Sequence, residues 1–192
     1  HLNRVYDAVI DVLHDYGASI IAFAGDAVTS WMEGDDGRRS TACALAIRSA
    51  MGQFAGVETP SGDLVSLTVK IVIAAGPARR FQVGDPDIRL LDALAGGTLA
   101  RLAAAETFAG AGEIILESQT AAGLDDVVEL IEKRTDPSLD LSCGVVGSLR
   151  IVDLEMPVPV VSHPLAVEQI RPWLHGPVYS RLQSGLGDFL AE

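Results

Sequence analysis

The sequence is poor in cysteine and aromatic residues, and it has no long apolar run. Two of its 192 residues are cysteines, Cys43 and Cys143, and no Cys-x-x-Cys pair exists, so neither a disulfide scaffold nor a structural zinc site is indicated. Both cysteines are expected to be small, buried apolar side chains. Aromatic residues make up 5%, so Val, Ile, Leu and Ala must build most of the core. No stretch approaches the roughly 20 apolar residues of a membrane span.

Positive charge is also scarce. Lys and Arg number 14 against 26 Asp and Glu, which gives a formal net charge of -12. Such a surface repels nucleic-acid phosphates, and no basic run exceeds two residues, so no nucleic-acid partner is expected. A bound polyphosphate would need a metal ion or a local positive field. The first residues, HLNRVYDAVIDV, contain acids and no cleavage site. They do not form a signal peptide, and a reduced, cytoplasmic location is expected.

What the sequence does contain is a series of amphipathic and β-rich segments that fit one α/β domain. Hydrophobic residues make up 48%, enough for a sizeable core. Helices are expected over 2–16, 97–109 and, with Ser40 as its cap, 40–54. Strands are expected over 17–23, 27–33, 64–76, 78–85, 88–96 and 112–117, followed by a helical turn at 118–124 and a later hairpin from 127–134 and 144–154.

The order of these segments predicts how they pair. Ala24-Gly25-Asp26 joins the first two strands into a hairpin, and 78–85 is the expected hairpin partner of 64–76. The expected fold is therefore an α/β (α+β) arrangement, close to a ferredoxin-like core, with an antiparallel-rich sheet flanked by helices. Its first strand is missing. The helical pattern is already under way at residue 2 without a cap, so we expect a preceding segment.

Composition changes at Met156, after which five of the nine prolines occur. Central strands cannot hold so many prolines. We therefore expect a domain over 1–155, an extended segment over 155–178 and a helix beginning at 179. Residues 156–192 would form a proline-rich linker and the start of a helix toward a further domain.

GASIIAFAGDAV, at 17–28, resembles the second metal-site hairpin of class III adenylate and guanylate cyclases. TACALAIRSAM, LTVKIVIAAG and GGTLARLAAAETFAGAGEIILE then follow in the order of that family, so the resemblance covers about residues 2–155. It implies the ferredoxin-like class III cyclase fold. It also implies an adenylate cyclase-like activity that converts ATP to 3′,5′-cyclic AMP and pyrophosphate, with ATP as the commoner substrate of the family and GTP as the other.

The resemblance also implies a metal site. In this family the ribose 3′-hydroxyl attacks the α-phosphorus, and two divalent ions, Mg²⁺ or Mn²⁺, lower the cost of that displacement. Asp26 matches the second of the two metal-binding aspartates; the first falls before His1. The residues just before Asp26, which are Phe23, Ala24 and Gly25, match the segment that lies against the substrate.

Four positions depart from the family. Its base-binding lysine falls at Ala22 and its second base-selecting residue at Ala93, while its transition-state Asn and Arg fall at Ala100 and Ala104. Alanine can neither read a purine edge nor offset charge on the α-phosphate. In this family each active site lies between two halves, one with the metal aspartates and one with Lys, Asn and Arg. The chain therefore resembles the metal half of a tandem, soluble-adenylyl-cyclase-like protein, and alone it is expected to be inactive.

A second interpretation stays open. The domain could be an inactive pseudo-cyclase, retained as a regulatory or interaction module of a larger signalling protein. Whichever interpretation holds for the domain, a Gly-Asp pair alone would make Asp26 an ordinary turn aspartate. Arg101, within the altered helix, is expected to be solvated. After residue 156 the resemblance implies a linker to a second cyclase half, which ATPase and helical-repeat modules often follow.

Overall fold

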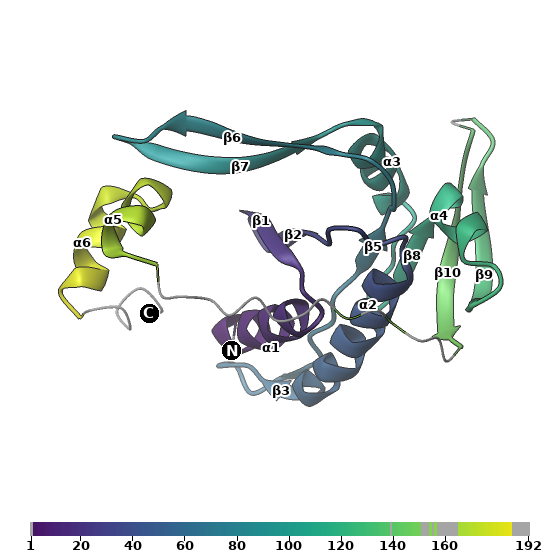
Figure 1. Ribbon diagram of the computed structural model, residues 1–192. Coiled ribbons are helices and arrows are strands. Elements are labelled where there is room, and N and C mark those ends of the chain that lie inside the picture. Colours follow the sequence, from purple (N-terminus) through teal and green to yellow (C-terminus); the bar gives the residue numbers. More distant parts are fainter. Residues whose placement is uncertain (1, 139, 151–153, 155, 157–164, 186–192) are drawn as a thin grey trace.

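The computed structural model describes residues 2–138, 140–150, 154, 156 and 165–185. Its body is a four-stranded sheet flanked by helices (Figure 1). The strands lie in the order β5-β8-β10-β9, with bounds Ile71–Ile73, Ile114–Glu117, Leu141–Leu149 and Val128–Asp136. β5 and β8 are parallel, whereas β10 is antiparallel to both β8 and β9. The expected fold class, with its antiparallel-rich sheet and flanking helices, is confirmed.

Side chains alternate along β8 and fill both faces of this sheet. Ile114 and Leu116 pack with Ala44 of α2 (Arg38–Ala50) and with Leu124, which follows α4 (Ser118–Gly123). On the other face, Ile115 packs with Ala105 of α3 (Gly97–Glu106). The three β8 side chains are fully buried, and each such burial contributes about 1.5–3 kcal/mol. Both cysteines are buried, as expected, and Cys143 packs with Ile115 on this sheet.

The N-terminal elements form a second packing unit beside the sheet. α1 spans Leu2–Asp15, and β1 (Ser19–Ala24) pairs with β2 (Ala27–Trp31) as an antiparallel hairpin, as the sequence predicts. Apolar residues on one side of α1 pack with side chains of α2 and of the hairpin around a shared cluster, which includes Leu13, Cys43, Ile47 and Phe54. Ile71 of β5 packs against the same cluster, so the hairpin and β5 share one core.

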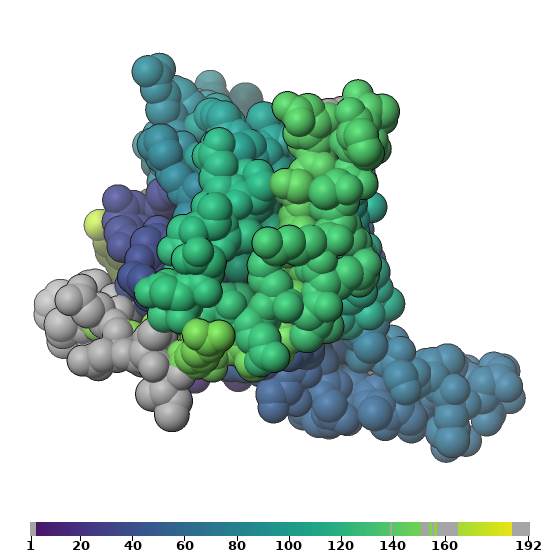
Figure 2. Space-filling view, turned by 90° about the vertical axis from the view of Figure 1, so that its right-hand side faces the viewer, coloured from purple at the N-terminus to yellow at the C-terminus, as the bar shows by residue number. Residues whose placement is uncertain are grey.

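The prediction of one long strand over 64–76 is wrong. Residues 64–65 form β4 (Leu64–Val65), which pairs with β3 (Val57–Glu58) in a small ribbon that projects from the body (Figure 2). The chain then leaves the ladder until β5. Consequently 78–85 is not the partner of that segment: β6 (Arg79–Asp85) pairs with β7 (Arg89–Ala95) in a separate long hairpin. The expectation of a strand over 88–96 is confirmed.

The start of α2 also differs from the prediction. The helix begins at Arg38 and its N-cap is Gly37, with φ 109°, so Ser40 is not the cap. The side chain of Asp35 accepts hydrogen bonds from the backbone N–H groups of Arg39 and Ser40, and that of Asp36 accepts one from Arg38. Two upstream carboxylates thus satisfy the free N–H groups of the first turn. α2 continues as a 3-10 turn, η1 (Met51–Phe54).

The segment at 165–185 is not extended, which corrects the prediction for that part of 155–178. It contains α5 (Val167–Ile170), η2 (Arg171–Trp173) and α6 (Gly176–Gln183). Helix formation thus starts before residue 179, and the rest of the expected helix, 186–192, lies outside the described residues. None of the helices in the described segments is long and apolar enough to cross a membrane.

Candidate functional site

Asp26 lies at the tip of the β1–β2 hairpin, in the two-residue turn formed with Gly25. Ala24 pairs with Ala27, so the turn closes directly on the ladder. Gly25 has φ 63°, a left-handed conformation that L-residues with a side chain rarely adopt. Phe23, Ala24, Gly25 and Asp26 are all exposed. The carboxylate is therefore held by a short, specified turn at the surface, where a ligand in solution can reach it.

Tyr6 of α1 supports this turn. Its hydroxyl donates a hydrogen bond to the carbonyl oxygen of Gly25 at 3.3 Å. Its ring meets that of Phe23 edge to face, with the centroids 5.9 Å apart and an interplanar angle of 78°. Phe23, expected to lie against a substrate, thus also packs on α1. No signal in the sequence indicates this role of Tyr6, because its position fits the helical pattern of α1 like that of any other residue.

The four alanines at the altered positions lie on three elements. Ala22 is on β1 and Ala93 is on β7, and these two strands contact each other. Ala100 and Ala104 lie on α3, which packs on β5, β8 and β10. The structure thus brings the strand of Ala93 against β1, the strand of the Asp26 hairpin that carries Ala22. None of the four offers a polar side chain.

Arg101 is not solvated, which corrects the prediction for this residue. Its Nη2 donates to the carbonyl oxygen of Ala75 at 2.8 Å, and its Nε lies 3.3 Å from Oε1 of Glu117. Glu117 is buried and is the N-cap of α4, where it accepts hydrogen bonds from the backbone N–H groups of Gln119 and Thr120. Arg101 therefore ties α3 to the end of β8, and it is a structural residue.

Burial opposes ionisation of Glu117, yet its pKa lies below the usual value. The causes are hydrogen bonds donated to its carboxylate by the backbone of Gln119, the hydroxyl of Ser118 and the backbone of Thr120, together with Arg101. Such donors favour the charged form of a carboxyl group. The ion pair with Arg101 is therefore present at neutral pH.

The described residues supply one candidate metal ligand at the hairpin rather than a complete site. No group of three or more His, Cys, Asp and Glu side chains in the described segments is placed to hold a metal ion. Mg²⁺ is commonly bound by one or two carboxylates plus substrate phosphates and water. The carboxylate of Asp26 is a hard oxygen ligand of the type that Mg²⁺ prefers. A site for two ions needs at least one more carboxylate.

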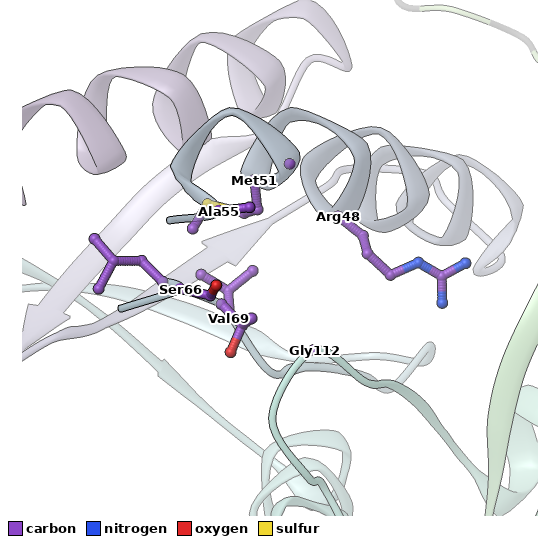
Figure 3. A pocket seen from close by; sticks show the side chains of 9 residues that line it. Arg48, Met51, Ala55, Ser66, Val69 and Gly112 are labelled. Atoms are coloured by element: carbon purple, nitrogen blue, oxygen red, sulfur yellow. The ribbon is translucent and has the colours of Figure 1, made fainter. Parts of the chain in front are cut away.

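Two hollows among the described residues lie away from the hairpin tip. One pocket, of about 170 Å³, lies between the end of α2 and residues 66–69 (Figure 3). It is smaller than the roughly 300–1,000 Å³ of ordinary ligand sites. Arg48 lines it but points away from the other labelled side chains and donates to the carbonyl oxygens of Val146 and Gly147. Neither this pocket nor a wider groove of about 610 Å³ beside Phe54 is lined by Gly25 or Asp26.

Comparison with solved structures identifies the fold. The guanylyl cyclase Cya2 is 21% identical, with a TM-score of 0.64 over 77% of this chain and 79% of that one. The catalytic core of a rhodopsin-guanylyl cyclase with converted specificity, in complex with ATPαS, is 19% identical, with a TM-score of 0.62 over 78% and 81%. The adenylyl cyclase CyaB from P. aeruginosa is 17% identical, with a TM-score of 0.59 over 78% and 81%.

Neither a protein-family model nor a curated protein sequence matches the chain. The structural likeness, at about 20% identity, therefore rests on backbone arrangement. It establishes that this chain has the fold of adenylyl and guanylyl cyclase catalytic domains.

Proposed function

We propose that this domain is the metal-bearing half of an adenylate cyclase, which converts ATP to 3′,5′-cyclic AMP and pyrophosphate at an interface with a second cyclase half. The observation that carries the proposal is an exposed carboxylate, Asp26, at the tip of a supported hairpin within a cyclase fold. The alanines at positions 22, 93, 100 and 104 agree with the proposal, because they remove base recognition and charge stabilisation from this half only.

In the proposed site, Asp26 provides carboxylate oxygens at the polyphosphate. A divalent ion, Mg²⁺ or Mn²⁺, would supply charge neutralisation for the phosphates there when bound. Ala24 and Gly25 carry small or no side chains and are exposed, so the backbone of the turn leaves room for a phosphate to approach. Tyr6 would hold the turn, and therefore the carboxylate, in a fixed orientation.

Two open strand edges support the proposal that a further strand carries the first metal-binding aspartate. β2 pairs only with β1, and β5 is the edge strand of the main sheet, so among the described residues each has one unpaired edge. Both pack on the same cluster under α1 and α2. These two open edges support a further strand that carries the first metal-binding aspartate, as the resemblance implies for a segment before His1.

The residues that this half lacks define its partner. Ala22 and Ala93 cannot recognise adenine or guanine, and Ala100 and Ala104 cannot offset charge on the α-phosphate. A second cyclase half, in the same or another chain, would supply the lysine, asparagine and arginine. Residues 156–192 would form the linker toward that half or toward further modules, and the protein would be cytoplasmic.

Activity of the purified 192-residue chain tests the half-site proposal. We expect no cyclic AMP or cyclic GMP above background when this chain is incubated alone with ATP or GTP and Mg²⁺ or Mn²⁺. Addition of a cyclase half that carries the lysine, asparagine and arginine should restore synthesis. A normal rate from the chain alone would show that its own residues suffice, and the half-site proposal would then be wrong.

The alternative function is a regulatory pseudo-cyclase. It agrees with the alanines at positions 22, 93, 100 and 104, which leave this chain without the groups that would read a base or offset charge on the α-phosphate. The strand that fills the open edges distinguishes the two functions: an aspartate there, in a context such as Phe-x-Asp-x-x-Gly-Phe, supports catalysis. A strand without an aspartate supports the regulatory module.

A further inference from the structure

The β6–β7 hairpin is long, and most of it lies away from the body of the molecule (Figure 1). Its two strands form a sheet of their own, and every residue of β6 is exposed. A two-stranded ribbon is at best marginally stable by itself in water. Contacts at its root and along β7 must therefore fix its position.

The root of this hairpin is held by α3. Thr98 of this helix donates a side-chain hydrogen bond to the carbonyl oxygen of Pro77 at 2.8 Å, just before β6 begins. Further along, β7 contacts β1, the strand that leads into the turn with Asp26. β7 is thus the element that connects this hairpin with the candidate site.

The other end of β7 is covered by the C-terminal segment 165–185, whose η2 contacts it. In Figure 1, α5 and α6 lie beside the end of the hairpin that is remote from α3. Arg89, the first residue of β7, lies with its Nη1 2.6 Å from Nε2 of His175. A guanidinium group has donors only, so Nε2 must accept, and the ring proton is on Nδ1.

The partial burial of Arg89 and of residues in segment 165–185 agrees with docking of this segment on β7. Arg89 is half-buried although its hairpin neighbours on β6 are exposed, and its Nε is buried without a hydrogen-bond partner among the described residues. Within the segment, five apolar or aromatic residues are half-buried, while the residues between them are exposed: Ile170, Pro172, Leu174, Val178 and Tyr179. Their partial burial agrees with the contact between η2 and β7.

We propose that residues 165–185 form a latch that docks on the free end of the β6–β7 hairpin and thereby holds β7 against β1. When the latch is docked, it limits motion of the β6–β7 hairpin and, through β1, of the turn that carries Asp26. When the latch is undocked, the β6–β7 hairpin and this turn both become more mobile. The inference does not depend on metal binding or cyclase activity, because it concerns the coupling between three segments of this chain.

Amide hydrogen exchange in the 192-residue protein tests the latch. His175→Lys places a second cation opposite Arg89 and removes the acceptor, so we expect exchange at β6, β7 and β1 to become about tenfold faster or more. His175→Gln keeps a side-chain acceptor and should retain most of the protection. His14→Lys, at an exposed histidine of α1, is the matched control and should leave all three strands unchanged.

Emission of Trp173, measured in a Trp31→Phe background, reports docking separately from hairpin motion. Undocking by His175→Lys should shift this emission to longer wavelength, since Trp173, which is 37% exposed, belongs to η2 and η2 contacts β7. If the emission shifts while exchange at β7 and β1 stays as in the control, the segment docks without acting as a latch. No change in either readout would show that the contact is unimportant. Should His175→Lys also expose β8 and β10, Arg89→Ala tests the same contact from β7.

Discussion

Replacement of Glu117 by alanine should be among the most destabilising single changes in this domain that leave the apolar core intact. Its carboxylate accepts hydrogen bonds from the backbone N–H of Gln119 at 3.0 Å and of Thr120 at 3.3 Å, and from the hydroxyl groups of Ser118 and Thr120. It also faces Arg101 at 3.3 Å. One change thus removes a helix cap and leaves a guanidinium group without its counter-ion.

The expected loss follows from these two parts. Removal of a side-chain N-cap costs about 1 kcal/mol. Loss of one partner of a fully buried ion pair costs about 3–5 kcal/mol, but the side chain of Arg101 is 27% exposed and can be partly solvated. We therefore expect Glu117→Ala to lower the free energy of unfolding by about 3 kcal/mol. Glu117→Gln, which keeps an acceptor oxygen, should lower it by about 1–2 kcal/mol.

Urea unfolding at neutral pH measures both values, with the exposed Glu58→Ala as the control. If Arg101 is structural, Glu117→Ala combined with Arg101→Ala should be less destabilised than the sum of the single variants, because no guanidinium group is then left unpaired. A loss below about 1 kcal/mol for Glu117→Ala, or strict additivity in the double variant, would refute this assignment of Arg101 and Glu117.

Three further predictions concern other parts of the chain. The hydrogen bond from Arg134 lowers the pKa of Glu113 to about 2. This carboxylate therefore contributes stability above its unfolded pKa of roughly 4.3, and that stability is lost as the pH falls toward 2. Glu113→Gln should make the free energy of unfolding depend less on pH in this acid range, and an unchanged pH dependence would contradict the assignment. Gly84 has φ 116°, and Gly84→Ala would place Cβ 2.1 Å from the carbonyl oxygen of Arg89. We therefore expect loss of amide protection across β6–β7. Gly52→Ala, with open space around it, should leave that protection as it is. Tyr6→Phe should speed amide exchange at residues 25–27 while it changes the free energy of unfolding by less than about 1 kcal/mol; equal exchange in both proteins would remove Tyr6 as a support of the turn.

The elements that the sequence predicted well are those specified by local pattern. α1 has apolar residues at helical spacing, and the hairpin with Asp26 has a glycine at the position where φ is positive. For β8, a short run of apolar residues marked a buried strand. In each case the residues that determine the structure lie within the segment itself, so pattern and fold agree.

The wrong predictions concern segments whose structure is determined by residues distant in the sequence. Residues 64–76 read as one strand, yet β4 pairs with β3 and β5 pairs with β8, and no local signal marks where the pairing partner changes. The sequence pattern predicts that Arg101 is a surface residue of a helix, but its side chain forms an ion pair with the buried Glu117, which is distant in the sequence. The candidate site shows the same division: the turn of Asp26 was predictable, whereas its support by Tyr6 depends on the packing of α1 against the hairpin.

Turnover of a protein that contains both cyclase halves, compared between wild type and Asp26→Ala, decides whether this hairpin belongs to a metal site. Cyclic AMP and cyclic GMP should be assayed with Mg²⁺ and with Mn²⁺, and Asp11→Ala, at an exposed aspartate of α1, is the matched control. We predict that Asp26→Ala reduces cyclic nucleotide formation to background, whereas Asp11→Ala leaves it unchanged. Unchanged turnover in Asp26→Ala would contradict the assignment of Asp26 as a metal ligand.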